Sequence, residues 1–539
     1  MRGETDEGDG GGDEWNDTVR GAATGLADVV RTTLGPNGMD KMVVGENGTV
    51  IVTNDGSRIV DWMDIVHPIG RCIERAAQAQ DDAVGDGTTT TVVLAAALLD
   101  EAATLRDEGV HPTTVVDGYA RATELALERL EECELAVNGR HDDRLDHVAQ
   151  TAVTGRWDDA STERFADLTL DALRRVEFDT SKLTLESVAG GELRESSCLD
   201  GILVDLESSS TSLEGPGHGR LRDIERPAIA MVDAEVGVPE PSRVESVRFE
   251  TAAEREAFQT HDRERRDAIV EAVKRSGATV LVSQKAIDET VRAELIGCGI
   301  LPVERTRRDE FDVIARATGA TPAASVDELT ASDTGAVESV ERRTAGSTEM
   351  VLFRGCPHER RVSLLLRGGT PHVASEVRRI ITDCIAVTRS AVGEGALLPG
   401  GGAAPTALAV DLATSARGIA DRRQLVVDGF ASALREIPRT LAANAGTDAI
   451  AALAALKQRH GDGETTVGIG VDGSPSEMVA AGVLEPAPVF RSALRRAVAV
   501  ATTVIRIDDI VRIEGEQTER DDHAHAHEAT GGYPWAVGH

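Results

Sequence analysis

The chain has 539 residues, too many for one hydrophobic core, so its length predicts two to four domains. Hydrophobic residues make up 41% of it, enough to build those cores, yet no apolar run is long enough to predict a transmembrane span. Lys and Arg total 57 against 92 Asp and Glu. The resulting formal net charge of -35 would repel phosphate backbones, so we expect no nucleic-acid partner.

The N-terminal stretch and the cysteines indicate the cellular compartment. Met1 to Asp17 is acidic and Gly-rich and lacks the regions of a signal peptide, so we expect a cytoplasmic protein without a membrane partner. The six cysteines form no CxxC pair, which argues against a zinc site or a disulfide framework.

The excess of acidic over basic residues runs along the whole chain. This favours adaptation to concentrated salt, where screening over roughly 3 Å at 1 M removes most self-repulsion, over an ordinary acidic protein.

The first third of the chain shows the periodicity of long amphipathic or Ala-rich helices. A short β segment, Val50 to Thr53, is followed by Asn54-Asp55-Gly56, which predicts a hairpin-like turn before Ser57 to Val60. The helices are predicted over Thr18 to Thr33, Pro68 to Ala83, Thr88 to Glu108 and Pro112 to Cys133.

The middle of the chain has the pattern of an α/β unit, and helices return after Pro371. Strands are predicted at Ala228 to Val232, Thr279 to Val282 and Leu301 to Val303, with helices at Ala253 to Ser276 and Ile287 to Ile296. The later helices are predicted over Val373 to Val392, Ala403 to Leu412, Asp421 to Ala443, Asp448 to Gln458 and Val489 to Val504. This order predicts an α/β domain inserted into a helical one, with two short crossings between them.

Gly-rich segments mark the candidate chemistry. Gly85-Asp86-Gly87 precedes Thr88, Thr89 and Thr90 at the start of a strong helix, where backbone amides can hold phosphate oxygens and Asp86 can hold Mg²⁺. Read alone, the same motif is an ordinary helix start. Three further segments have this character: Thr33-Leu34-Gly35-Pro36-Asn37-Gly38, Leu398-Pro399-Gly400-Gly401-Gly402-Ala403 and Gly468-Ile469-Gly470-Val471.

Two more carboxylates are candidates to activate water beside such a metal. Asp55 lies in the predicted tight turn, and Asp383 lies within the apolar helix segment Ile380 to Val387. Spacing alone favours Asp383 being an ordinary helix-surface charge.

Seven spaced segments together resemble the group II chaperonins, the thermosome of archaea and its eukaryotic cytosolic relatives. They are Arg31 to Met42 (RTTLGPNGMDKM), Val52 to Gly56 (VTNDG), Gln80 to Leu94 (QDDAVGDGTTTTVVL), Pro399 to Ala403 (PGGGA), Asn444 to Ile450 (NAGTDAI), Leu484 to Pro486 (LEP) and Arg506 to Val511 (RIDDIV). The acidity further suggests a halophilic archaeon as the source.

The resemblance implies an α+β multidomain fold, the chaperonin fold. A mostly helical equatorial domain would be formed by both chain ends, at 1–137 and 394–514. A small intermediate hinge domain would occupy 138–205 and 358–393, with an inserted α/β apical substrate-binding domain at 206–357. The remaining 515–539 would be a disordered tail containing His523, His525 and His527.

The resemblance also assigns roles to residues. Asp55 and Asp383 would be catalytic and Asp86 would bind Mg²⁺, with K⁺ as a second candidate cation. In the apical domain, the helical protrusion would correspond to Phe249 to Arg266, where Phe249 and Phe258 would contact client protein or neighbouring lid tips. ATP would be bound by Thr33, Leu34, Gly35, Pro36, Gly56, Gly87, Thr88, Thr89, Thr90, Gly401 and Glu485, the last as an acceptor from the ribose or adenine.

The chain departs from the family pattern at several positions. Pro405 stands where an acidic residue is common, and Arg156 replaces a lysine that senses the nucleotide, keeping the charge but presenting a planar fork. The N-terminal strand usual in the family is missing or replaced by Met1 to Asp17.

The resemblance implies an ATP-dependent chaperone subunit whose ATP hydrolysis closes a double-ring chamber around unfolded client proteins. Its partners would be those clients and other chaperonin subunits, alike or different. The departures leave open a structural or weakly hydrolysing subunit of a hetero-oligomeric ring. A soluble metabolite kinase is disfavoured because the matches extend to Arg506 to Val511, outside any nucleotide loop.

Overall fold

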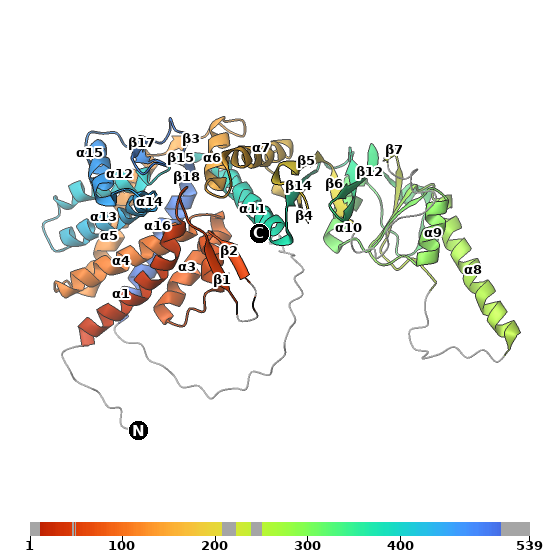
Figure 1. Ribbon diagram of the computed structural model, residues 1–539, viewed down its shortest axis with the longest axis horizontal. Helices are drawn as coiled ribbons and strands as arrows, with labels where there is room; N and C mark the ends of the chain where they lie inside the picture. Colours follow the sequence, from red (N-terminus) through yellow and green to blue (C-terminus); the bar gives the residue numbers. More distant parts are fainter. Residues whose placement is uncertain (1–10, 46–47, 49, 207–222, 239–250, 508–539) are drawn as a thin grey trace, which may run out of the picture.

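The computed structural model describes residues 11–45, 48, 50–206, 223–238 and 251–507. Three regions follow one another along its length (Figure 1). We call them the helical body (described residues of 11–136 and 396–505), the middle region (138–200 and 362–394) and the outer region (described residues of 202–354). The mixture of helices and several small sheets confirms the α+β fold class. The domain boundaries expected from the sequence stay predictions.

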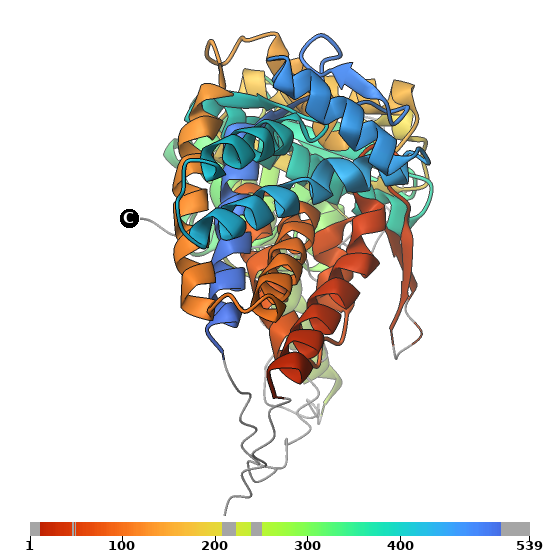
Figure 2. The same cartoon turned by 90° about the vertical axis from the view of Figure 1, so that its left-hand side faces the viewer.

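The helical body is built from both ends of the chain, whose helices lie side by side in Figure 2. One continuous apolar core joins α1 (Gly11–Val30), α3 (Pro68–Val84), α4 (Thr88–Asp107), α5 (Pro112–Glu132), α12 (Ala403–Ala416), α13 (Arg423–Leu434) and α16 (Ala487–Ile505). Of the described helices, α4 alone is long and apolar enough to cross a membrane by length and composition. Because 67% of its apolar window is buried inside the structure, it has the environment of a core helix.

The sequence suggested a hairpin-like turn at Asn54-Asp55-Gly56, but this segment does not join two strands. β2 (Val50–Thr53) pairs instead with the preceding β1 (Lys41–Val44), and Ser57 to Val60 lie in helix α2 (Gly56–Trp62). The reason is that Asp55 caps this helix: its side chain accepts a hydrogen bond from the Arg58 amide. The hairpin-like turn predicted here is therefore wrong, because these residues begin a helix.

The helix expected over Asp421 to Ala443 is two helices. α13 ends at Leu434, and α14 (Glu436–Asn444) begins two residues later. Pro438 explains the break, since its ring would clash with the Leu434 carbonyl and it has no amide hydrogen to donate. α15 (Ala449–Gly461), β16 (Val467–Ile469) and β17 (Pro475–Glu477) complete this side of the body.

The middle region packs three helices on a three-stranded sheet. The sheet has the order β4-β14-β5, with β4 (Leu183–Ala189), β14 (Val362–Gly368) and β5 (Ser197–Asp200). One apolar core joins it to α6 (Arg144–Val153), α7 (Asp159–Arg175) and α11 (Pro371–Glu394). A small sheet, β18-β15-β3, links it to the body through β18 (Leu484–Pro486), β15 (Ala396–Pro399) and β3 (Leu135–Ala136).

The outer region contains two four-stranded sheets. The first has the order β10-β9-β8-β11, with β8 (Ala228–Val232), β9 (Val280–Ser283), β10 (Leu301–Val303) and β11 (Gly335–Ala336). The second has the order β6-β13-β12-β7, with β6 (Ile202–Asp205), β7 (Asp223–Glu225), β12 (Ser339–Ala345) and β13 (Thr348–Arg354). Three helices accompany them: α8 (Ala252–Arg275), α9 (Glu289–Gly297) and α10 (Arg308–Thr318). The strands and helices predicted here from the α/β pattern are confirmed within a few residues.

Candidate active site

A cavity of about 280 Å³ opens where the helical body meets α11 and the loop after α6. Segments from both ends of the chain contribute to its wall. Fifteen of the residues singled out in the sequence line it: Thr33, Leu34, Gly35, Pro36, Asp55, Gly56, Asp86, Gly87, Thr88, Thr89, Thr90, Arg156, Asp383, Gly401 and Glu485. The structure therefore brings together residues up to 452 positions apart, from Thr33 to Glu485 (485 minus 33).

The start of α4 forms one wall of the cavity. Its N-cap is Gly87, in the left-handed conformation at φ 82°, and no side chain caps the helix. A Cβ at this position would lie 2.9 Å from Gln80 Nε2 and 3.0 Å from Val489 Cγ1, so a larger residue would not fit. The first-turn amides and the positive end of the α4 dipole are thus directed at the cavity, an arrangement suited to an anion.

Asp86 lies immediately before this helix. Its Oδ1 accepts a hydrogen bond from the Gly87 amide at 2.6 Å, and its carbonyl accepts one from Gln80 Nε2 at 2.8 Å. The side chain is accessible from within the cavity but surrounded by protein at longer range, and this loss of water raises its pKa.

Asp55 reaches the cavity from the N-terminus of α2. Its Oδ1 accepts from Ser57 Oγ at 2.6 Å and from the Arg58 amide at 3.0 Å. Burial alone would raise its pKa, but Arg379, Ser57 and Arg156 outweigh burial and lower it. Gly56 lets α2 approach α4, because a Cβ there would lie 2.2 Å from Thr89 Oγ1.

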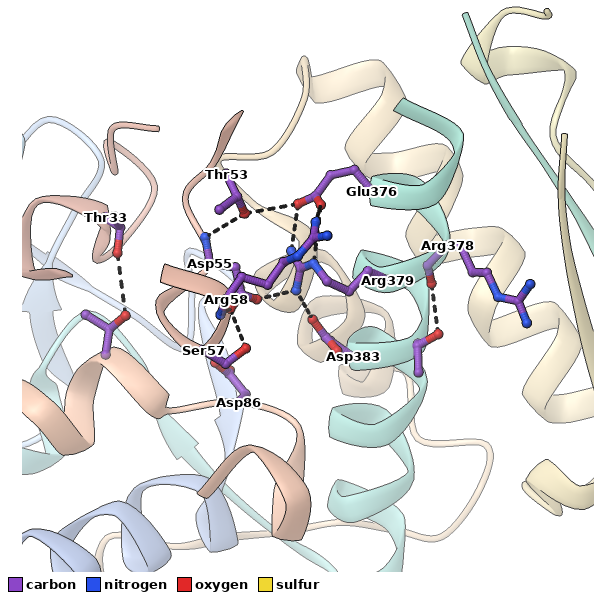
Figure 3. A network of polar contacts seen from close by, with 12 residues as sticks. Thr33, Thr53, Asp55, Ser57, Arg58, Asp86, Glu376, Arg378, Arg379 and Asp383 are labelled. Carbon is purple, nitrogen blue, oxygen red and sulfur yellow. Dashed lines mark hydrogen bonds and ion pairs between the residues drawn. The ribbon is translucent and has the colours of Figure 1, made fainter. Parts of the chain in front are cut away.

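Asp383 faces Asp55 from α11, and one arginine joins the two carboxylates (Figure 3). Arg379 Nη1 donates to Asp55 Oδ2 and, at 2.6 Å, to Asp383 Oδ2. Loss of water raises the pKa of Asp383 well above its ordinary value, an effect that Arg379 offsets in part. The two carboxylates therefore sit in environments that push their pKa values apart, as acid–base pairs do.

Glu485 lines the opposite side on β18, whose strand pairs it with Leu398. Burial, with the nearby charge of Asp86, raises its pKa to about 8. The raised pKa favours the protonated carboxyl group, which can donate a hydrogen bond as well as accept one.

The loop from Thr33 to Pro36 is held by a side chain from the other end of the chain. Asn444 Nδ2 donates to the carbonyls of Arg31 and Leu34, at 2.9 and 2.8 Å. Nearby, Asn37 Nδ2 donates to the Val471 carbonyl at 2.7 Å. These contacts fix the loop that would flank a nucleotide.

Arg156 reaches the cavity from the loop after α6, and Asn54 Nδ2 holds that loop through the Gly155 carbonyl at 3.3 Å. Its positive charge lowers the pKa of Asp55 and opposes the increase at Asp86 and Asp383.

Sequence reasoning missed several residues of the site. Asp81 lines the cavity, and burial together with Asp55 raises its pKa to about 6. Arg379 and its partner Glu376 lie behind the two carboxylates. Arg379 stands four residues before Asp383 on one helix, a spacing that places both on one face and could have revealed it.

Phe258, expected to contact client protein, lies on α8 in the outer region and is 40% exposed. Phe249 and the tail containing His523, His525 and His527 lie outside the described residues. Of the described site residues expected from sequence, Phe258 is the one that does not line the cavity.

The residues present fit a magnesium nucleotide. Asp86 offers a carboxylate beside an uncapped helix N-terminus, and Mg²⁺ in such sites is held by one or two carboxylates together with substrate phosphates. Within the described part of the chain, no group of three or more His, Cys, Asp or Glu side chains is arranged to hold a metal on its own.

A family model for the TCP-1/cpn60 chaperonins matches residues 26–514, and the chain belongs to this family. It is 38% identical over 509 residues to thermosome subunit alpha of Halobacterium salinarum, covering 93% of this chain and 89% of that protein. It is also 38% identical over 500 residues to thermosome subunit alpha of Thermoplasma acidophilum, covering 91% and 90%. A thermosome subunit of Pyrococcus horikoshii is 35% identical over 509 residues, covering 93% and 91%.

These relatives confirm the group expected from the sequence motifs. The chain is a group II chaperonin, an ATP-dependent chaperonin subunit. The alternative of a structural or weakly hydrolysing subunit is not favoured.

Proposed function

We propose that the cavity hydrolyses Mg–ATP and that hydrolysis drives closure of a double ring around unfolded client protein. The observation that supports this most is the convergence of Asp55, Asp86 and Asp383 with the uncapped start of α4 in one cavity. Each of the three carboxylates comes from a different segment of the chain, and each lies in a different electrostatic environment.

The start of α4 would bind the phosphates. The amides of Thr88, Thr89 and Thr90 and their hydroxyl groups offer donors to phosphate oxygens, and Gly87 allows the backbone to approach closely. Asp86 would hold Mg²⁺, which when bound neutralises charge that develops on the transferred phosphoryl group.

Asp55 and Asp383 would have different roles toward the attacking water. Asp55 stays ionised, because Ser57, Arg58 and Arg379 all donate to it, and its role would be to orient the water electrostatically. Asp383 has the raised pKa of a proton acceptor and would take the proton that the water loses.

The opposite wall would hold the nucleoside. Leu34, Gly35, Pro36 and Gly401 line this part of the cavity, and Gly401 leaves no room for a side chain, because a Cβ would lie 2.5 Å from Met478 Sδ. Glu485, whose raised pKa favours the protonated form, would donate to an acceptor on the ribose or adenine, in addition to the accepting role expected from the sequence.

Arg156 would report the state of the nucleotide to the middle region, since it lines the cavity from the loop between α6 and α7. The outer region would then bind client protein, with Phe258 supplying exposed apolar area on α8, many of whose exposed side chains are charged. The partners would be unfolded proteins and other chaperonin subunits in a cytoplasmic double ring, and K⁺ is a second candidate cation.

The direct test is substitution of Asp383 by Ala. We expect kcat for Mg-dependent ATP hydrolysis to fall at least about tenfold, roughly 1.4 kcal/mol of barrier, because the proton acceptor is lost. The affinity for a fluorescent ATP analogue should stay within about threefold of wild type, since phosphates and metal are held elsewhere. Equal turnover in both proteins would remove Asp383 from the reaction.

A further inference from the structure

The guanidinium of Arg379 occupies the space between the two carboxylates that face each other across the cavity wall (Figure 3). One nitrogen, Nη1, donates to both Asp55 Oδ2 and Asp383 Oδ2. Arg379 itself does not line the cavity, and its side chain is 19% exposed. It thus acts on the carboxylates from behind and would not touch a nucleotide.

The other face of the guanidinium is fixed by Glu376. Arg379 Nη2 donates to Glu376 Oε1 at 2.8 Å, and Arg379 Nε donates to Glu376 Oε2 at 3.4 Å. A planar fork bound in this way has few alternative orientations.

Glu376 is in turn held by the helical body. Arg58 Nη1 on α2 donates to its Oε2 at 2.6 Å, and Thr53 Oγ1 on β2 donates to its Oε1 at 3.4 Å. The Thr53 hydroxyl also accepts from the Asp55 amide at 3.1 Å. The chain of contacts therefore closes on Asp55 and ties α11 of the middle region to the body.

This arrangement distinguishes the two carboxylates. Asp55 has both oxygens engaged, Oδ1 by Ser57 and Arg58 and Oδ2 by Arg379. Asp383 has Oδ2 engaged by Arg379, and within the described residues no hydrogen bond reaches its Oδ1. The oxygen available to receive a proton is therefore Asp383 Oδ1.

A second cation, Arg156, faces the same carboxylates but forms no ion pair with them in the described part of the chain. The other aspartates that interact with the pair are Asp81 and Asp86, which repel negative charge rather than orient it. Direct positioning of both carboxylates thus depends on Arg379.

We infer that Arg379 is a positioning residue for hydrolysis: it holds Asp55 and Asp383 at a fixed separation so that Asp383 Oδ1 is presented to the attacking water. The inference rests on the proposed ATP hydrolysis at this site. It assigns a role to the contact between α11 and α2 that neither the motifs nor the cavity lining reveals.

The test is ATP hydrolysis by the full-length protein carrying Arg379→Gln or Arg379→Lys. We expect Gln to lower kcat about 10- to 100-fold while KM for ATP stays within about threefold, because the carboxylates lose their alignment and the nucleotide contacts remain. Lys keeps the charge but not the fork, so it should restore kcat only in part. The rate constants for single-turnover hydrolysis of pre-bound ATP should fall in the same order, from wild type through Arg379→Lys to Arg379→Gln.

Arg389→Gln is the matched control, because Arg389 is an exposed arginine on the same helix and donates to Thr180. It should leave kcat within about twofold of wild type. Glu376→Gln should lower kcat severalfold, and adding it to Arg379→Gln should cause little further loss, since the two residues act as one unit.

The outcomes separate the two claims. A wild-type protein that does not hydrolyse ATP overturns the proposed function itself. An active wild type with unchanged kcat in Arg379→Gln overturns only the inference. If Arg379→Gln does not assemble, Arg379→Lys and Glu376→Gln decide, and the inference is wrong if both match wild-type kcat.

Discussion

The cavity and the outer helix α8 are both rich in charge, but the charges do different things. At the cavity, Asp55 and Asp383 are joined from behind by Arg379, across segments more than 300 residues apart in sequence. On α8, Arg265 makes a bidentate pair with Asp327, and its other described charges lie mostly in solvent. The difference indicates that charged residues mark a functional site where the fold gathers them around one cavity, and not where they are spread along an exposed helix.

The first way to test this contrast is to compare two neighbouring aspartates on either side of the cavity wall. Asp86→Ala should lower kcat for Mg-dependent ATP hydrolysis about 100-fold or more, because the proposed metal ligand is lost. Asp82→Ala removes the same charge from an exposed position of α3 and should leave kcat within about twofold. Steady-state ATPase rates over a range of Mg²⁺ concentrations would measure both, and similar losses would remove the distinction.

The second concerns client binding by α8. Phe258→Ser should abolish most protection of a denatured model client against aggregation, since an exposed apolar ring is replaced by a small polar group. ATPase activity should remain within about twofold. Ala257→Ser, at the neighbouring exposed position, is the control. Aggregation followed by light scattering decides, and full protection by Phe258→Ser would place client binding elsewhere on the outer region.

The third and smallest effect concerns Glu186, where the middle and outer regions meet. Burial, followed by the charge of Glu310, raises its pKa to about 7, while Arg307 and Arg378 oppose the increase and Asp205 adds to it. Its side chain is 12% exposed, and Arg307 lies 3.9 Å away. A raised pKa in the folded state means that stability is lost as pH rises toward and through 7.

We therefore expect the thermal midpoint of the wild type to fall by a few degrees more between pH 6 and 8 than that of Glu186→Gln. Glu328→Gln, at an exposed position, should behave like wild type. Thermal unfolding at several pH values provides the measurement. If the two curves stay parallel, Glu186 does not titrate in this range.

Local sequence predicted much of the cavity wall, because the Gly-rich loops and helix starts that form it are each encoded by a few consecutive residues. The Gly85 to Thr90 segment predicts a helix start with open amides, and the structure has α4 beginning at Thr88 with no side-chain cap. The meeting of distant residues could not be predicted in this way. Nothing in the spacing of Asp55 and Asp383 shows that they lie close together, and only the family resemblance implied it.

What could not be predicted depends on tertiary contacts or on competing local signals. Asn54-Asp55-Gly56 is a strong turn signal, but Asp55 uses its side chain to start a helix instead. The contacts of Arg58 with Glu376 and of Arg379 with Asp55 join α2 to α11 across more than 300 residues, so no local pattern contains them. The spacing of Arg379 and Asp383 on one helix is the local part of this arrangement. Pro438 did carry a readable signal, since proline near a helix start marks a break that periodicity alone overlooks.

The most direct test of the account is ATP-dependent refolding of a denatured client by wild type and Asp383→Ala. The account predicts that wild type returns the client to activity when Mg–ATP is added, whereas Asp383→Ala binds client and nucleotide but yields little active product. Equal refolding by both proteins would contradict it, because closure would then not depend on hydrolysis in this cavity.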